Sequence, residues 1–187
     1  MALIIKRAET REEIEAAQRL AQEVYVEELN FVDMNDFKRA TEPYEDCSLS
    51  FVAIMNGKVV GTMKLVSHYG TGKLPMEEAF ELPDFLTHQR ERALEVSRAA
   101  IRKDIRGDKI SHAILLGMLK AIYIYAKENH FVYLAACMYP QIFKTLAEKL
   151  NWNFQWIGAG NADLFKQFLI PVILEIRDEN VNFEIKK

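Results

Sequence analysis

An acidic and a basic side chain lie three residues apart in the segment from Glu95 to Arg98. If Glu95 lies on a central strand, it could accept a proton directly or through water, because partial desolvation raises the pKa of a carboxyl toward working pH. In a regular strand Arg98 would face away from Glu95, since successive side chains alternate between the two faces. A bulge within residues 95–101 would change that and would free backbone N–H groups for a carbonyl oxygen. From spacing alone, an exposed or ion-paired carboxylate is the favoured interpretation of Glu95.

A group of cations follows this segment. Its members are Arg98, Arg102, Lys103, Arg106 and Lys109. They precede Ser111, which we expect to be the N-cap of a helix, and a helix N-terminus offers free N–H groups and a partial positive charge. The turn could therefore hold a phosphate or pyrophosphate. The alternative is a solvated, charged turn that only caps the helix.

The periodicity of apolar residues predicts the elements that would position these side chains. Thr10 and Glu13 have the spacing of a capping box, ahead of a helix expected at residues 12–27. Residues 30–49 are polar, contain a proline and have no clear period. We therefore expect a long loop there, and loops of this length inside compact domains are often functional.

The rest of the chain predicts a mixed sheet. Asn56-Gly57 lies between two strand-like runs at residues 50–55 and 58–66, which is the strongest short hairpin signal. Further strands are expected at 3–6, 93–101, 131–138, 154–157 and 168–176, and further helices at 111–129 and 140–150. A strand, an apolar helix and a second buried strand form a crossover unit with parallel strands. We therefore predict an α/β (α+β) sandwich with a mixed, mostly antiparallel sheet and helices on both faces.

Composition limits the class of protein. The chain has 187 residues, 50% hydrophobic and 27% charged, so we expect a single domain over residues 1–187. Its net charge of −3 argues against a general nucleic-acid binder. We find no signal-peptide pattern and no apolar run long enough for stable membrane insertion, so we expect a cytoplasmic protein. Cys47 and Cys137 form no CxxC motif and the histidines are isolated from one another, so we expect no metal site.

The basic turn resembles the coenzyme A pyrophosphate loop of the GNAT acyltransferase superfamily. The matching residues are Ile101, Arg106, Gly107, Ile110 and Ser111. Lys109 replaces the first glycine of that loop. The expected order of strands and helices is also similar to the GNAT fold. The resemblance implies that these residues, Lys109 included, bind the phosphates of an acyl donor.

A narrower resemblance, over about residues 4–176, is to the acyl-homoserine-lactone (autoinducer) synthases and the related N-acyl amino acid synthases. It is carried by residues 24–29, 61–65, 74–80 and 95–98, and by Asp46 before the hairpin. The chain has Ala21, Phe31 and Lys64 where autoinducer synthases have Arg, Trp and Arg. These differences favour the N-acyl amino acid branch, or another relative of these synthases, over homoserine-lactone synthesis.

The resemblance implies roles for single residues. Glu95 and Arg98 would be catalytic, with Glu95 as base for the amine and Arg98 orienting the amine or an acceptor carboxylate. Asp46, Lys64 and Ser97 would bind substrate.

Tyr139 and Trp156 each have a functional and a structural interpretation, whereas Cys137 has only a structural one. Tyr139 follows the strand beyond which many acetyltransferases place a tyrosine that protonates the departing thiolate, or it is a packed aromatic. Trp156 could line an acyl pocket or could serve packing alone. We interpret Cys137 as a core cysteine, because no histidine is positioned by sequence to activate it.

We therefore expect an N-acyltransferase. It would move an acyl group from a 4′-phosphopantetheine thioester, on acyl carrier protein or coenzyme A, to the amine of an amino acid or a similar small acceptor. The alternatives are an acetyl-CoA-dependent N-acetyltransferase of small amines and a non-catalytic GNAT-fold binding module. The thioester would be a substrate, with no permanently bound cofactor, and the chain a monomer or homodimer. A deep apolar tunnel beside the central strand would favour long acyl chains, and a shallow cleft would favour acetyl.

Overall fold

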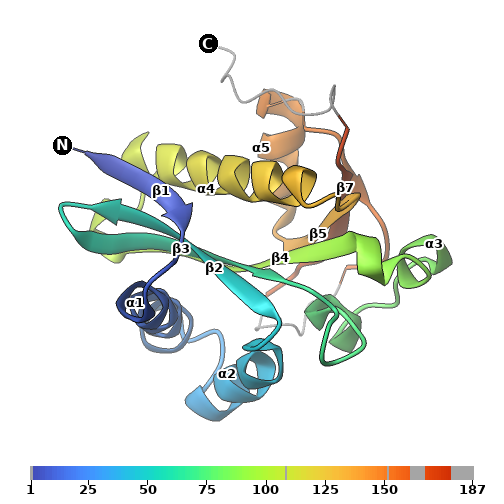
Figure 1. The fold of residues 1–187 in the computed structure, drawn as a ribbon, viewed down its shortest axis with the longest axis horizontal. Coiled ribbons are helices and arrows are strands. Elements are labelled where there is room, and N and C mark those ends of the chain that lie inside the picture. Colours follow the sequence, from blue (N-terminus) through green and yellow to red (C-terminus); the bar gives the residue numbers. More distant parts are fainter. Residues whose placement is uncertain (1, 108, 151, 161–166, 178–187) are drawn as a thin grey trace.

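The computed structural model describes residues 2–107, 109–150, 152–160 and 167–177. Within these residues one sheet has the strand order β1-β2-β3-β4-β5-β7-β6 (Figure 1). The strands are β1 Leu3–Arg7, β2 Ser48–Met55, β3 Lys58–Val66, β4 Ala93–Ile101, β5 Tyr133–Met138, β6 Phe154–Trp156 and β7 Ile170–Glu175. Neighbouring strands are antiparallel except β4 and β5, which are parallel. The predicted mixed, mostly antiparallel sheet is confirmed.

Helices cover both faces of the sheet, as predicted. The α-helices are α1 Arg11–Gln22, α2 Met34–Thr41, α3 Asp84–Thr87, α4 Lys109–Glu128 and α5 Pro140–Leu150. A π-helical turn, η1 Glu23–Glu28, continues α1, and short 3₁₀ turns are η2 Glu42–Tyr44, η3 Pro75–Glu78, η4 Arg90–Arg92 and η5 Lys103–Ile105. Figure 1 shows α1 and α2 on one face of the sheet and α4 on the other. The two faces therefore offer separate environments for ligands.

Two predictions about elements are wrong. The expected loop at residues 30–49 contains α2, because the Asp33 side chain caps its first turn by accepting from the Asp36 N–H at 2.8 Å. This helix has 8 residues, too few for a clear apolar period. Ser111 is not the N-cap of α4, because that helix already begins at Lys109.

The main hydrophobic core lies between the sheet and α4. Strand alternation sends Met63 and Leu65 of β3 into this core, where each is 1% exposed. Burying one such side chain contributes about 1.5–3 kcal/mol. By length and composition alone α4 could cross a membrane, but in this fold it contacts strands β1, β2 and β3 as a core helix.

The parallel strands β4 and β5 separate partway along their length. They pair from Ala93 opposite Tyr133 only as far as Val96 opposite Ala136, although β4 continues to Ile101. Beyond that point β5 remains paired with β7. The predicted parallel pair that diverges at its C-terminal ends is confirmed, and the divergence opens the sheet beside Glu95 and Arg98.

Candidate active site

A bulge in β4 brings Arg98 beside the same cavity as Glu95. On β3, Thr62 and Lys64 lie opposite Ala100 and Ser97, so that two β4 residues face the single residue Met63. Arg98 is one of these two, and its φ of +52° lies in the left-handed region that residues with a side chain rarely adopt. Such a conformation persists only where the surrounding fold holds it, and residues of this kind cluster at functional sites. The bulge considered from the sequence is present.

Glu95 is a buried carboxyl, 3% exposed. Its Oε2 accepts a 2.7 Å hydrogen bond from the Met76 N–H of η3. Burial raises the pKa of Glu95 to about 8, against the opposing effects of this hydrogen bond and of the Arg98 charge. A carboxyl with this pKa can exchange a proton near neutral pH, as a general base must.

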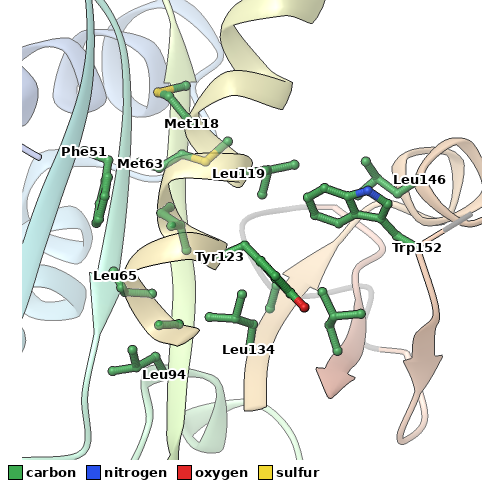
Figure 2. Packing of buried hydrophobic residues seen from close by; sticks show 14 of the residues in the cluster. Phe51, Met63, Leu65, Leu94, Met118, Leu119, Tyr123, Leu134, Leu146 and Trp152 are labelled. Atoms are coloured by element: carbon green, nitrogen blue, oxygen red, sulfur yellow. The ribbon is translucent and has the colours of Figure 1, made fainter. Parts of the chain in front are cut away.

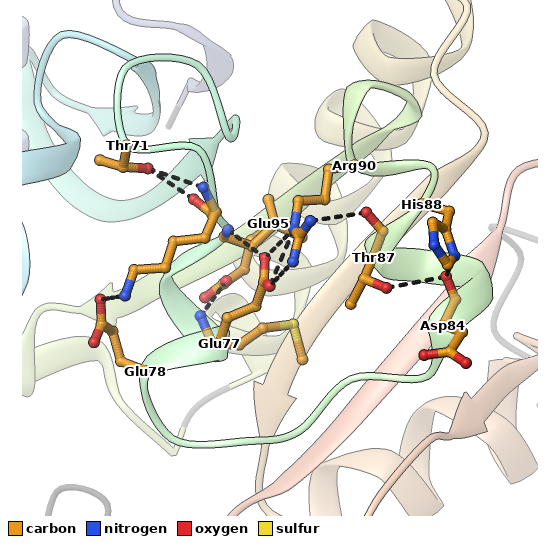
Figure 3. A network of polar contacts seen from close by, with 11 residues as sticks. Thr71, Glu77, Glu78, Asp84, Thr87, His88, Arg90 and Glu95 are labelled. Atoms are coloured by element: carbon orange, nitrogen blue, oxygen red, sulfur yellow. Dashed lines mark hydrogen bonds and ion pairs between the residues drawn. The ribbon is translucent and has the colours of Figure 1, made fainter.

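The segment that carries Met76 is itself held by an ion pair (Figure 3). Arg90 Nε donates to Glu77 Oε1 at 2.8 Å, and Arg90 Nη2 pairs with Glu77 Oε2. Glu77 Oε1 also accepts from the Leu74 N–H at 2.8 Å, and Arg90 Nη1 donates to the Thr87 carbonyl at 2.9 Å. Burial raises the pKa of Glu77, but the bonds from Arg90 and Leu74 outweigh it and leave the pKa below its ordinary value. The two side chains fix η3 against Glu95.

One terminal nitrogen of the Arg98 guanidinium forms a hydrogen bond within the described residues, and the other does not. Its Nη2 donates to the Ala40 carbonyl of α2, which ties the bulge to that helix. Its Nη1 is buried and has no hydrogen-bond partner among the described residues. Burial lowers the pKa of Arg98, yet a guanidinium remains charged in proteins. A buried cationic donor without a partner favours an anionic ligand.

A large apolar cavity begins at Glu95, Ser97 and Arg98 and extends into the core. Its volume is about 730 Å³. Its inner walls include Met63, Leu119, Leu134, Leu146 and Trp152. Figure 2 shows Leu119 of α4 pointing toward Trp152 and Leu146 of the C-terminal segment, with Met63 on the strand side of the helix. We call it the apolar cavity. Because it passes between the separated strands, a ligand at Glu95 can extend an apolar chain into the core.

A second cavity, of about 320 Å³, lies between the sheet and the two N-terminal helices α1 and α2. All its lining residues are polar or charged except Ala17, Ala21 and Phe37. We call it the polar cavity. It shares Phe37, Thr41 and Arg98 with the apolar cavity, so the two cavities meet at Arg98.

An ion pair lines the polar cavity. Lys64 Nζ pairs with Glu45 Oε1, and Gln18 Nε2 donates to Glu45 Oε2 at 2.8 Å. Burial lowers the pKa of Lys64, and the bond from Glu45 partly offsets that effect. Lys64 therefore lines the polar cavity, and its role in substrate binding stays a prediction.

Two residues with predicted roles in substrate binding, Asp46 and Trp156, lie away from both cavities. Asp46 is exposed and lines neither, whereas its neighbour Glu45 lines the polar cavity. Trp156 is 51% exposed on β6 and also lines neither. Their predicted roles in substrate binding stay predictions.

The basic turn is only partly available to a phosphate. Arg106 Nη2 pairs with Glu28 at the end of η1, and Arg106 Nε donates to the Ile101 carbonyl at 2.8 Å. Gly107 has a φ of +85°, and Lys109, Ile110 and Ser111 form the first turn of α4. A donor phosphate at this turn would compete with Glu28 for Arg106.

Tyr139 and Cys137 both line the apolar cavity. Burial raises the pKa of the Cys137 thiol, so this cysteine is a poor nucleophile and its interpretation as a core residue is retained. Burial also raises the pKa of Tyr139, which keeps the phenol protonated and able to donate. Three groups at these cavities have no local signal in the sequence: the Met76 N–H and the Ser50 and Thr62 hydroxyls.

Solved structures share this fold. FeeM, an N-acyl amino acid synthase from uncultured soil microbes, is 20% identical with a TM-score of 0.75, over 95% of this chain and 92% of that chain. BjaI, a CoA-dependent acyl-homoserine lactone synthase, is 16% identical with a TM-score of 0.72, over 96% of this chain and 86% of that chain. A GNAT-family acetyltransferase from Staphylococcus aureus Mu50 is 15% identical with a TM-score of 0.58, over 94% and 100%.

The sequence itself matches one family. No curated protein matches the chain. The family model described as N-acyl amino acid synthase FeeM matches residues 16–145, which is more than half of the chain and includes Glu95, Arg98 and both cavities' central strands. The chain therefore belongs to the FeeM family of N-acyl amino acid synthases, and it is an N-acyltransferase.

Proposed function

We propose that this acyltransferase moves a long acyl group from a 4′-phosphopantetheine thioester to the α-amine of an amino acid. The observation that carries the proposal is the apolar cavity of about 730 Å³ that opens at Glu95 and Arg98. Cavities of roughly 300–1,000 Å³ enclose ligands much larger than an acetyl group. A mostly apolar cavity of this size supports long acyl chains over acetyl.

Glu95 is the base in this proposal. The neutral amine attacks the thioester carbonyl, and its nitrogen passes one proton to the Glu95 carboxylate as the C–N bond forms. The C–S bond breaks, and the departing thiolate takes a proton from Tyr139. Proton exchange with solvent then returns Glu95 to its carboxylate and Tyr139 to its phenol. Backbone groups of β4 beyond Val96, which have no β5 partner, can donate to the developing oxyanion. Arg98 Nη1 binds the carboxylate of the acceptor.

The donor is acyl carrier protein or acyl coenzyme A. The basic turn suits either the pyrophosphate of coenzyme A or the acidic surface of a carrier protein. We place the enzyme in the cytoplasm, since both described cysteines are free, which fits a reducing compartment. The described elements share one sheet and one main core, which supports a single domain, active as a monomer or homodimer.

The test is an assay of amide formation by mass spectrometry. Acyl-carrier and acyl-CoA donors, from acetyl to long chains, are each paired with a panel of amino acids and simple amines. We expect acyl amino acids from long-chain donors and little product from acetyl donors. Product only from acetyl donors and non-amino-acid amines would contradict the proposal.

A matched pair of variants tests whether the chain enters the apolar cavity. Leu115→Trp places a bulky group in the cavity wall, whereas Leu116 is a neighbour on α4 that packs on the core and lines neither cavity. We expect Leu115→Trp to shift the preferred donor to a shorter acyl chain and Leu116→Trp to leave the preference unchanged. The same shift in both variants would show that the effect is general destabilisation.

A further inference from the structure

The polar cavity holds most of the buried polar side chains of the described residues. Six polar or charged residues are buried in the described part of the chain: Thr41, Ser50, Thr62, Lys64, Glu95 and Ser111. The first four line the polar cavity. Buried polar groups are costly unless they are hydrogen-bonded, so this concentration requires a physical reason.

Two of these hydroxyls lack partners in the described part of the chain. Ser50 is 8% exposed and Thr62 is 3% exposed, both line the polar cavity, and no hydrogen bond joins either hydroxyl to another described group. By contrast the charged pair Lys64 and Glu45 is satisfied by its own contact. Neither hydroxyl oxygen is among the fully buried, unpaired atoms of the described residues, so both keep accessible surface where their residues line the cavity and are available to a ligand that fills it.

The cavity and the proposed base occupy one face of the sheet. Ser50 on β2 lies directly opposite Lys64 on β3, and Thr62 is two residues from Lys64, so the three side chains share a face. Val66, two further residues along β3, lies directly opposite Glu95. Glu95 therefore projects on the same side of the sheet as the unpartnered hydroxyls.

Arg98 connects the two environments, since it lines both cavities. An amino acid with its amine at Glu95 and its carboxylate on Arg98 Nη1 has one substituent left to place, its side chain. The apolar cavity is then occupied by the acyl chain. The remaining space next to Arg98 is the polar cavity, which the small side chains of Ala17 and Ala21 on α1 keep open.

We infer that the polar cavity receives the side chain of the acceptor and selects amino acids whose side chains form hydrogen bonds over apolar amino acids of the same shape. This inference rests on the proposed amino-acid acceptor. A site built to hydrogen-bond its substrate discriminates strongly against an isostere, because its own polar groups are then left unpaired. Ser50 and Thr62 are the specificity-determining residues.

The test compares isosteric acceptors with one long-chain donor. Threonine against valine and asparagine against leucine differ mainly in hydrogen-bonding capacity. We expect kcat/KM to favour the polar member of each pair by about tenfold or more in the wild-type enzyme. In Thr62→Val combined with Ser50→Ala this ratio should fall toward one. Thr145→Val removes a hydroxyl on α5, outside both cavities, and should keep the wild-type ratio.

Ala21→Leu gives an independent check that does not alter a hydroxyl. The added side chain fills part of the polar cavity, so the ratio of threonine to glycine acylation should fall. Thermal shift of the wild-type protein should also be larger with threonine than with valine.

The outcomes separate this inference from the proposed function. Equal acylation of polar and apolar amino acids by the wild type overturns the inference and leaves the proposed function standing. An unchanged threonine-to-valine ratio in the folded double variant, or an unchanged threonine-to-glycine ratio in Ala21→Leu, also overturns it. Acylation of simple amines but of no amino acid overturns the proposed acceptor and the inference with it.

Discussion

The backbone N–H of Met76 and the carboxylate of Glu95 form a 2.7 Å hydrogen bond across 19 residues of sequence. The bond stabilises the ionised form of a carboxyl whose burial favours the neutral form, and the pKa settles at about 8. Glu95 is therefore poised between its two protonation states at working pH. The rate of the reaction and the stability of the fold should therefore both depend on the protonation state of Glu95.

Replacing Glu95 by Gln should remove the base and preserve the shape of the site. We expect turnover to fall by about 10²–10⁴-fold, the usual contribution of a general base. Donor affinity should persist, since the apolar cavity is unchanged. The measurements are steady-state rates and a titration of the acyl donor. Glu91→Gln is the matched control, because that carboxylate is exposed and lines neither cavity, and an equal rate for Glu95→Gln and wild type would remove Glu95 from the role of base.

The pH dependence of the rate should report the same carboxyl. Only ionised Glu95 accepts a proton, so kcat/KM should rise with pH and level off above about pH 8. Arg90→Gln breaks the ion pair with Glu77 that holds η3 in place. This change should weaken the hydrogen bond from the Met76 N–H that lowers the pKa of Glu95. We therefore expect its rising limb to lie at higher pH than in the wild type.

Arg92→Gln is the control for that shift. Arg92 is an exposed arginine of the same 3₁₀ turn and contacts Gln89 instead of Glu77. Its profile should match the wild type. If the pH profiles of kcat/KM for Arg90→Gln and Arg92→Gln coincide, the ion pair of Arg90 with Glu77 has no influence on the pKa of Glu95.

Stability should depend on pH through Glu95 in a direction fixed by its pKa. The folded state raises this pKa from its ordinary 4.5 to about 8, so the folded protein binds the proton more tightly than the unfolded chain. The resulting stabilisation is complete below about pH 4.5 and is lost as pH rises to about 8. Glu95→Gln cannot ionise, so its melting temperature relative to wild type should increase over this range. A difference that stays constant with pH would contradict the raised pKa.

The ion pair of Arg106 with Glu28 gives a prediction about the donor. Glu28→Gln removes the competing carboxylate, so donor affinity should increase several-fold, whereas Arg106→Glu should weaken it. Both effects should shrink as salt rises, because partly exposed charges are screened. Calorimetric titration with acyl-CoA and with acyl carrier protein measures them. Unchanged affinity of Arg106→Glu at low salt would place the donor phosphates elsewhere.

The parts of the fold that follow local rules could be predicted from sequence. Asn56 and Gly57 both have positive φ in the hairpin turn, as the Asn-Gly signal predicts. Thr10 accepts from the Glu13 N–H at 3.2 Å in the predicted capping box. Each of these features depends on neighbours within a few residues, which the sequence displays directly.

The parts of the site that depend on distant contacts could not be predicted. The Met76 N–H meets Glu95 only because Arg90 and Glu77 fold an irregular segment back onto β4. Glu45 lines the polar cavity where Asp46 was expected, and adjacent carboxylates cannot be told apart without the backbone path of η2. The pairing of Ser50 with Lys64 likewise needs the register of the sheet.

The apolar cavity is bounded by members of the main core, among them Met63, Leu134 and Trp152. An acyl chain bound there therefore acts as one more core side chain, supplied by the substrate. Each methylene that it buries contributes about 0.8 kcal/mol, and a ligand that binds only the folded state raises its stability accordingly. With bound donors of increasing acyl length, we expect the melting temperature to rise with each added carbon until the chain reaches the end wall of the cavity. The length at which the rise stops would therefore give the longest acyl group that the core can enclose.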